Sequence, residues 1–400
     1  MDTAIRQPPT RNQTAEDIVR AAEDFVPVLR ALAVKTDEDR RITDDIYRQM
    51  EDAGFFHILK PKKYGGLELS EEVHAKVTMT LAQGCASTAW VFSILDADNS
   101  LFLCFSEEVQ DEVWGTDSYA TLAGYTGFNP KAKVEAVEGG YRVSGSWAFC
   151  SGSDFSSWLV FVVPIGDAGE PHVIIVPNEK AMTVDDWFPT GMRGTGSRTK
   201  VLDEVFIPER HVLSFPALQE GWAASRELHP SFDMLHTTFP SYGKFEFAGV
   251  AVGAAIAAVE HFAQTAASST RVAHALGGNY NLADQDYAAS EFAQASGDVL
   301  LAQYMVERQS RDISERTRLR IPSSELDLAT WNRNYSLVTR TAVRAVNQIA
   351  ALIGAKTGNP AHPVSRAKRD IEMLAHHVTL NWRQASVQYL AATTKAAAED

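Results

Sequence analysis

The period of the apolar residues changes twice along this chain of 400 residues, and the two changes limit the folds that it can adopt. Over residues 14–112 apolar side chains recur every three or four positions, which is the spacing of one face of an α-helix. Over residues 119–213 the period becomes two and turn residues are frequent, as in a β-sheet. Helical spacing then continues to the end. The pattern predicts an α+β fold that is mostly α.

Four hundred residues exceed a single ordinary hydrophobic core, so we divide the chain into three units. These are an N-terminal helical domain over residues 1–117, a middle β-barrel or β-sandwich domain over 118–225, and a C-terminal helical bundle over 226–400. Gly54 should end one helix, and Ser70 should begin another over residues 70–97. The longest bundle helix should run from the cap in PSSELD to Gly354, about 45 Å at 1.5 Å per residue.

Charge and cysteine content exclude several classes of partner and compartment. The formal net charge of -14 and the pI of about 5.3 leave no general attraction for nucleic acid or an anionic membrane. The three cysteines form no CxxC pair and are too few for a disulfide framework, which indicates a reducing cytoplasm. The first residues lack the apolar core of a signal peptide, and no run of 18 apolar residues occurs. We expect a cytoplasmic protein without a nucleic-acid or membrane partner.

Common nucleotide-binding and catalytic motifs are absent from the sequence. No G-x-G-x-x-G follows a strand, and neither a P-loop, an H-E-x-x-H nor a G-x-S-x-G occurs. A pyridine-nucleotide site, a metalloprotease and an α/β-hydrolase are therefore not indicated. His376 and His377 cannot easily bind one metal ion, because adjacent residues on a helix project about 100° apart. We expect no metal.

The segment GMRGTGSRTK, residues 191–200, has a structural and a functional interpretation. Its glycines and arginines fit a long surface loop before a strand. They also fit a site for an anion or a polar ring, because glycines let backbone N–H groups approach a ligand closely. Arg193 or Arg198 would then supply positive charge, and Ser197 and Thr199 would supply hydroxyl donors. The sequence leaves both interpretations open.

The segment WAFCSGSDFSSWL, residues 147–159, interrupts a regular pair of strands with small and hydroxylated residues. It fits a β-bulge or a hairpin end in which Trp147, Phe149 and Trp158 belong to the core. It equally fits a wall against which a flat ligand stacks.

The segment RAKRDIEMLAHHVTLNW, residues 366–382, carries an acidic residue and a histidine seven positions apart. On a helix, two turns would bring Asp370 and His377 onto one face, with Leu374 between them. His377 would then belong to an apolar stripe. It is either a satisfied core histidine or a partly buried imidazole that transfers protons near neutral pH.

Taken in order, five segments resemble the acyl-CoA dehydrogenase fold and, within it, the oxygenase components of the two-component, group D flavin-dependent monooxygenases. The resemblance spans nearly the whole chain, and the fourth segment is the most specific. The segments are GFFHILKPKKYGG, CASTAWV, GGYRVSGSWAFCSGSDFSSWLV, WFPTGMRGTGSRTKVLDEVFIPERHVL and NPAHPVSRAKRDIEMLAHH. The family implies N-terminal helices, a middle β domain, a C-terminal helical bundle and a homotetramer.

The resemblance also implies a mechanism with no nicotinamide site in this chain. In the family, a separate flavin reductase supplies reduced FMN or FAD, which reacts with O2 to give a C4a-hydroperoxide. The distal oxygen then passes to an electron-rich aromatic ring, here phenolic, polyketide-derived or indolic. The pocket should exclude water and offer hydrogen bonds to the flavin and its peroxide.

Residue-by-residue carry-over from the family gives candidate site residues. Ser151 and His377 would stand near the reactive edge of the flavin as catalytic residues. Thr126 would lie beside flavin or substrate, and Arg271 resembles the helix arginine that binds flavin phosphate across the subunit interface. The loop residues assigned to flavin are Arg193, Thr195 and Ser197.

One departure from the family concerns the substrate. Many phenol-hydroxylating relatives have a histidine a few residues after STAW, and this chain has Asp98 at about that place. Asp98 could accept a hydrogen bond from a phenol or an indole N–H, as a catalytic or substrate-binding residue, or it could face solvent. The substrate wall is expected in the aromatic-rich connector, at Trp222, His236 and Phe239.

Other functions stay open. An acyl-CoA dehydrogenase needs a glutamate base, commonly in a YEG-type motif after the RD helix, and this chain has HHVTLNW there. The base can sit elsewhere in that superfamily, so a dehydrogenase is one alternative. A flavin N-oxygenase acting on an amino sugar is another, and a non-catalytic binding protein of the same fold is the third.

Overall fold

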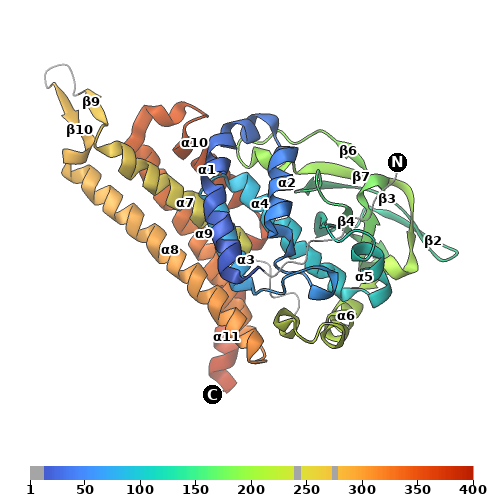
Figure 1. The fold of residues 1–400 in the computed structure, drawn as a ribbon. Helices are drawn as coiled ribbons and strands as arrows, with labels where there is room; N and C mark the ends of the chain where they lie inside the picture. The colour runs from blue at the N-terminus through green and yellow to red at the C-terminus, as the bar shows by residue number, and fades with distance from the viewer. Residues whose placement is uncertain (1–12, 238–244, 273–277, 400) are drawn as a thin grey trace.

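The computed structural model of the chain describes residues 13–237, 245–272 and 278–399. Long helices of the C-terminal part form one side of the molecule, the strands of residues 122–214 form the other, and the N-terminal helices lie between them (Figure 1). This is the arrangement that the two changes of apolar period predict, because each type of element must bury its apolar face against another.

The described N-terminal part is helical. It contains α1 (Ala15–Asp39), α2 (Asp44–Ala53), α3 (Glu71–Ala82), α4 (Ala86–Asp98) and α5 (Glu107–Trp114), with 3-10 turns at Phe55–His57, Lys62–Tyr64 and Asn99–Cys104. Thr14 and Asp17 form a capping box at the start of α1. Gly54 ends α2, as predicted.

The helix predicted over residues 70–97 is in fact two helices, and the break lies at Gly84 and Cys85. A Cβ at Gly84 would lie 2.6 Å from the Cβ of Leu29 and 2.8 Å from the carbonyl oxygen of Val26. The crossing of α1 therefore leaves no room for a side chain at this point. Beyond it α4 starts afresh and packs against the strands.

The middle part forms two four-stranded sheets, of order β1-β4-β5-β8 and β2-β3-β7-β6. The strands are β1 (Leu122–Phe128), β2 (Lys133–Val137), β3 (Gly140–Cys150), β4 (Trp158–Ile165), β5 (Glu170–Pro177), β6 (Met182–Val184), β7 (Arg198–Pro208) and β8 (Val212–Ser214). Buried side chains of both sheets share one core, in which Trp147 stacks on Phe161 at 4.3 Å between ring centroids. Neither described sheet closes on itself, so the domain is a sandwich and not a barrel.

The C-terminal part returns to helices. They are α6 (Phe215–Leu228), α7 (Phe245–Ala266), α8 (Asp286–Arg318), α9 (Glu325–Ile353), α10 (Pro363–Leu374) and α11 (Trp382–Glu399), and β9 (Thr270–Val272) pairs with β10 (Asn279–Asn281). The helix predicted from PSSELD to Gly354 is α9, with a capping box of Ser324 and Asp327. It is not the longest, because α8 has 33 residues and α9 has 29.

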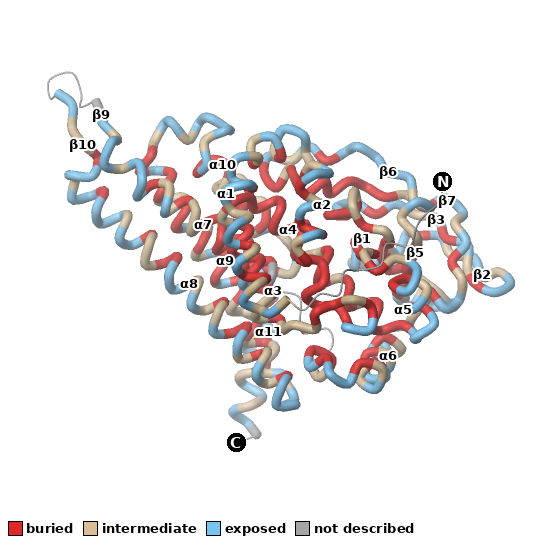
Figure 2. Tube along the Cα trace, in the orientation of Figure 1, coloured by how far each residue is buried: buried red, intermediate tan, exposed pale blue. Residues whose placement is uncertain are grey.

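The main core lies where α3, α4, α7 and α9 pack together, and buried residues are concentrated there in Figure 2. Over Phe247–Ala266, α7 has the length and the mean hydropathy, 1.4, of a membrane span. However, 61% of that window is buried inside the fold. We therefore read α7 as a core helix.

Candidate active site

A cavity of about 760 Å³ lies between α4, the first sheet, the loop before β7 and the end of α10. This volume is typical of sites that hold small molecules or cofactors. The lining residues with hydroxyl, carboxyl or imidazole groups are Asp98, Tyr125, Thr126, Ser151, Thr195, Ser197, His376, His377 and Thr379. The cavity thus brings together side chains from segments that are far apart in the sequence.

Three hydroxyl groups form a directed chain on one wall of the cavity. The Thr195 hydroxyl donates to the carbonyl oxygen of Met192 at 2.8 Å, and it lies 2.6 Å from the Ser197 hydroxyl, which lies 2.6 Å from that of Ser151. A carbonyl can only accept a hydrogen bond, so the Thr195 hydroxyl donates its hydrogen to Met192. It must therefore accept a hydrogen bond from the Ser197 hydroxyl. Ser197 must in turn accept from Ser151. The chain therefore leaves the Ser151 oxygen as an acceptor toward the cavity.

The loop before β7 is held in place from behind by α10. The buried carboxylate of Asp370 accepts a hydrogen bond from the backbone N–H of Met192 at 2.6 Å. Burial raises the pKa of Asp370 to about 6, because the charged form is disfavoured away from water. The same Met192 carbonyl that anchors Thr195 also accepts from the indole N–H of Trp187 at 3.2 Å. One residue thereby fixes both the hydroxyl chain and Trp187.

The two arginines of this loop do not line the cavity. Arg193 donates to the backbone oxygens of Asp37, at 2.9 Å, and Pro189, at 3.1 Å. Arg198 forms ion pairs with Asp185 and Asp154. In the single subunit, carboxylates and backbone carbonyls take part of the donors of both arginines, and the contact of Arg193 with flavin stays a prediction.

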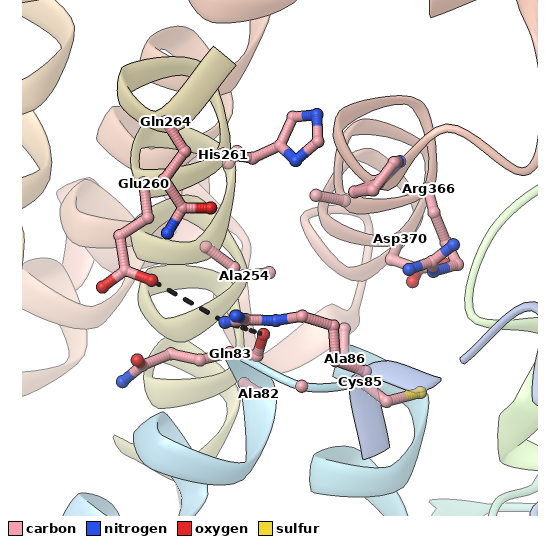
Figure 3. Close-up of a pocket in the computed structure, with 16 residues that line it drawn as sticks. Ala82, Gln83, Cys85, Ala86, Ala254, Glu260, His261, Gln264, Arg366 and Asp370 are labelled. Carbon is pink, nitrogen blue, oxygen red and sulfur yellow. Dashed lines mark hydrogen bonds and ion pairs between the residues drawn. The ribbon is translucent and has the colours of Figure 1, made fainter. Parts of the chain in front are cut away.

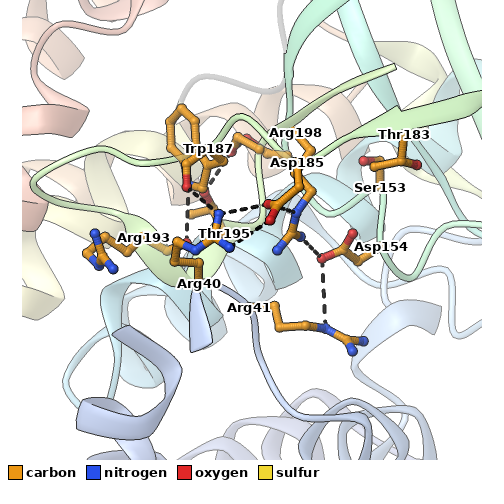
Figure 4. Close-up of polar contacts among 12 residues, drawn as sticks. Arg40, Arg41, Ser153, Asp154, Thr183, Asp185, Trp187, Arg193, Thr195 and Arg198 are labelled. Atoms are coloured by element: carbon orange, nitrogen blue, oxygen red, sulfur yellow. Dashed lines mark hydrogen bonds and ion pairs between the residues drawn. The ribbon is translucent and has the colours of Figure 1, made fainter. Parts of the chain in front are cut away.

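Arg40, the last residue before the turn into α2, completes this ion network (Figure 4). Its guanidinium makes two hydrogen bonds to the Asp185 carboxylate, of 2.7 and 2.8 Å, and one to the Trp187 carbonyl oxygen. Hydrogen bonds from Arg40 and from Arg198 hold the pKa of Asp185 below its usual range, because these two cations favour the ionised carboxylate. The network links α1 to the segment that carries Trp187.

Replacing Arg40 with alanine is expected to loosen the segment 185–197 with little change in overall stability. Exposed ion pairs contribute little to stability one by one, but this pair also holds the Trp187 backbone in place. Hydrogen exchange of peptides covering 185–197 should become roughly tenfold faster. Arg20→Ala is the matched control, because Arg20 lies on the same helix and pairs with Asp17 alone among the described residues. Equal exchange in both variants would show that the network does not position this wall.

The strand β3 contains the β-bulge that its sequence predicts as one alternative, and it also forms part of the cavity wall, which is the other alternative. The pairing of β3 with β7 shifts register between Trp147 and Cys150, and Phe149 there has a φ of 65°. Trp147 faces the sandwich core, whereas Phe149 is 61% exposed and lines the cavity. Its ring meets that of Trp187 edge to face, 5.7 Å between centroids. Trp187 and Phe149 therefore offer a flat ligand an aromatic surface, although Trp187 is not among the site residues that the sequence predicts.

His377 lies on the cavity wall, but not on a helical face as predicted. The helix α10 stops at Leu374, and His377 begins the 3-10 turn Val378–Leu380. Its ring contacts Trp90 and Phe247, at centroid distances of 5.3 and 4.7 Å. The helical argument that placed it with Asp370 was wrong, because the chain leaves the helix between them.

The imidazole of His377 is neutral and presents one N–H to the cavity. Burial lowers its pKa to about 4. Its Nδ1 lies 2.8 Å from the Thr379 hydroxyl and also accepts from the Thr379 backbone N–H. A neutral ring that accepts at Nδ1 carries its proton on Nε2. No described residue bonds to Nε2, so this donor faces the cavity.

Asp98 lines the cavity at the last turn of α4. It is half-buried, and desolvation raises its pKa to about 7. No described residue forms an ion pair or a side-chain hydrogen bond with its carboxylate. Of the two interpretations of Asp98, the structure places it on the cavity wall and not on the outer surface.

The remaining predicted residues are spread over several places. Thr126 lines the cavity from β1. Trp222 and His236 do not; Trp222 is buried and donates to the carbonyl oxygen of Thr237 at 3.1 Å. Phe239 lies outside the described residues, and so does the side chain of Arg271, whose backbone is in β9. The connector wall is instead formed by Phe215 and Leu218 of α6.

A second cavity lies between α7, α10 and the α3–α4 turn, and it is much smaller (Figure 3). Its volume is about 80 Å³, enough for a few water molecules and not for an aromatic ligand. Arg30 bridges it, contacting Glu260 at 3.7 Å and the Gln83 carbonyl oxygen at 3.4 Å. Within the described residues, no group of three His, Cys, Asp or Glu side chains is placed to hold a metal ion.

Comparison with family models gives two matches. Residues 12–114 match the acyl-CoA dehydrogenase N-terminal domain, and residues 245–382 match the acyl-CoA dehydrogenase C-terminal domain. The two models therefore cover the helical parts on either side of the sandwich.

Similar proteins extend the match over nearly the whole chain. The oxygenase subunit HsaA of a flavin-dependent monooxygenase from Rhodococcus jostii is 31% identical over 91% of this chain and 95% of its own. The oxygenase component of the FADH2-dependent resorcinol hydroxylase from Rhizobium sp. is 32% identical over 94% of this chain and 93% of its own. The crystal structure of 3-HSA hydroxylase from Rhodococcus sp. RHA1 superposes with a TM-score of 0.87, at 27% identity, over 95% of this chain and 97% of that one.

Proposed function

The chain belongs to the flavin-dependent monooxygenases that share the acyl-CoA dehydrogenase fold, and from that premise we propose that it is an oxygenase component that hydroxylates an aromatic ring. The observation that supports this most directly is the cavity of about 760 Å³, with aromatic walls, a directed hydroxyl chain and one imidazole donor. The ring to be hydroxylated would be phenolic, polyketide-derived or indolic.

The residues of the cavity fit a reduced flavin. The dihydro form of the flavin ring carries an N–H where the oxidised form carries a bare nitrogen, so it needs an acceptor. The hydroxyl chain ends in such an acceptor at Ser151. We assign the ring to Ser151, Thr126 and the aromatic surface of Trp187 and Phe149, with Thr195 and Ser197 acting through Ser151.

When bound, reduced flavin would supply the two electrons that activate O2, and O2 would supply the oxygen atom that enters the substrate. The chain supplies the surroundings. Apolar walls exclude water, which strengthens every hydrogen bond made inside the cavity. His377 offers a neutral N–H that can donate to an oxygen or a nitrogen of a bound group. Arg193 donates to backbone oxygens and does not line this cavity, so we do not assign it to the flavin ring.

Two partners follow from this function. The sequence has no motif for a pyridine nucleotide, so a separate flavin reductase would supply the reduced flavin. We also propose a homotetramer. Apolar side chains on the outer faces of α8 and α11 support it, since Leu301, Val387 and Leu390 are each at least 65% exposed in the single subunit. Arg271 would reach the flavin of a neighbouring subunit.

The test is a single-turnover reaction without a reductase. Photoreduced FMN or FAD, the full-length protein and a panel of phenols and indoles are mixed with ¹⁸O2. The expected result is a product that carries one ¹⁸O atom. Failure of reduced FMN and of reduced FAD to raise the melting temperature, even at high excess, would contradict any flavin site, because a ligand that binds the folded state must stabilise it.

The dehydrogenase alternative lacks its base in this cavity. Among the described lining residues the one carboxyl group belongs to Asp98, and no glutamate lines the cavity. Bleaching of bound oxidised flavin by an acyl-CoA thioester would overturn the oxygenase proposal in favour of a dehydrogenase.

A further inference from the structure

Asp98 and His377 line separate parts of the cavity. The cavity-lining residues of α4 run from Trp90, which contacts His377, to Asp98 in the last turn. Eight residues at 1.5 Å each place Asp98 about 12 Å along the helix axis from Trp90. A ligand about as long as a fused aromatic ring system would span this separation along α4.

The walls around Asp98 are apolar. Val160 and Val162 lie on one face of β4, and Val173 of β5 pairs with Val162. Leu101 and Leu218 line the cavity from the adjoining 3-10 turn and α6, which pack together. Such surroundings hold an aromatic ring, and Asp98 provides the carboxylate among them.

The charged group that lines this end of the cavity is negative. No lysine or arginine occurs among the described lining residues, and Asp98 is the one carboxylate. Burial raises its pKa to about 7, so it is mostly ionised at pH 8, and no described residue places a cation or a hydrogen-bond donor beside it. A partly desolvated charge without a partner is unfavourable, and a ligand that supplies the partner removes that penalty.

We propose that Asp98 selects the substrate by charge: the cavity accepts an aromatic ring that carries an O–H or N–H donor, or a positive charge, at the end remote from His377, and rejects one with a carboxylate there. The Asp98 carboxylate accounts both for the attraction of a donor or cation and for the rejection of an anion. The donor satisfies the carboxylate, whereas a second anion within a few ångströms is repelled with little screening. This inference rests on the proposed function, since it takes the cavity to be the place of the aromatic substrate.

The test uses three ligands that share one ring system and differ in a single group. They are 2-naphthol, which is neutral, 2-(aminomethyl)naphthalene, which is a cation, and 2-naphthoate, which is an anion. Each is titrated calorimetrically into the flavin-free, full-length protein at pH 8. We expect the neutral and cationic ligands to bind roughly 100-fold more tightly than the anion. In Asp98→Asn the three affinities should fall within about tenfold of one another.

The matched control is Glu108→Gln, which removes one negative charge from a side chain that is 78% exposed on α5. It should keep the wild-type order, because an exposed charge is screened by solvent. Equal binding of the anion and the neutral ligand by the wild type overturns the inference, and so does an unchanged order in Asp98→Asn. Failure of all three ligands to bind, with and without reduced flavin under anaerobic conditions, overturns it as well. Because these readouts are affinities, failure of ¹⁸O transfer would count against the proposed function and not against the selection by charge.

Discussion

Replacing His377 with asparagine is expected to lower the product formed per reduced flavin consumed by roughly tenfold or more, with the missing oxygen released as hydrogen peroxide. The substitution removes the N–H that faces the cavity, together with the ring that packs against Trp90 and Phe247. An asparagine is shorter, so it cannot place a donor at the same point. The fold should persist, because His377 lies in a turn outside α10. Product is measured by chromatography and hydrogen peroxide by a peroxidase assay, in the same single-turnover mixtures.

Two further variants separate the role of His377 from a general effect of losing a histidine. His172→Asn removes an imidazole on β5 that bonds to the Glu170 backbone and lies outside the described cavity lining, so coupling should stay at the wild-type value. Thr379→Val removes the hydroxyl that holds Nδ1 and should give a partial loss. If His377→Asn couples as well as wild type, His377 takes no part in protecting the oxygen that is transferred.

The elements that the sequence predicts well are those whose signals are local. In α9 the apolar spacing, the capping residues Ser324 and Asp327 and the terminal Gly354 all belong to the helix itself. The break at Gly84 has a different origin, because it depends on α1 crossing some 55 positions earlier in the chain. Helical periodicity likewise does not reveal that α10 ends at Leu374. For that reason the sequence predicts His377 on a helix, whereas it lies in the turn that follows.

The candidate site shows the same division between local and distant causes. Ser151, Thr195 and Ser197 were chosen from the sequence, and the structure joins them in one hydrogen-bonded chain. The charge of Arg193 was equally visible, but its direction is set by the Asp37 backbone, 156 positions away. Positive charge in a glycine-rich loop therefore indicates a polar contact without saying whether a ligand or the protein itself provides it.

Replacing Gly191 with alanine is expected to destabilise the protein by roughly 3 kcal/mol and to weaken reduced-flavin binding by at least about tenfold. A Cβ at this position would lie 2.0 Å from the backbone oxygen of Arg369 and 2.9 Å from the backbone nitrogen of Asp370. Since both atoms belong to the rigid backbone of α10, the loop must move away. That movement breaks the buried bond from Met192 to Asp370 and shifts the carbonyl that anchors the hydroxyl chain. Urea denaturation measures the first effect, and calorimetric titration with anaerobic reduced flavin measures the second.

Gly297→Ala is the control for this prediction, because it makes the same change in a helix where no described atom beyond the local helix backbone lies within 4 Å of the added Cβ. It should be neutral or slightly stabilising, since alanine favours a helix. Two changes at Asp370 separate steric displacement from the lost hydrogen bond. Asp370→Asn retains an oxygen that accepts from Met192 and should bind flavin nearly as wild type does, whereas Asp370→Leu should resemble Gly191→Ala. A Gly191→Ala protein with wild-type stability and flavin affinity would mean that the loop can leave α10 without cost, and that the hydroxyl chain does not depend on this contact for its position.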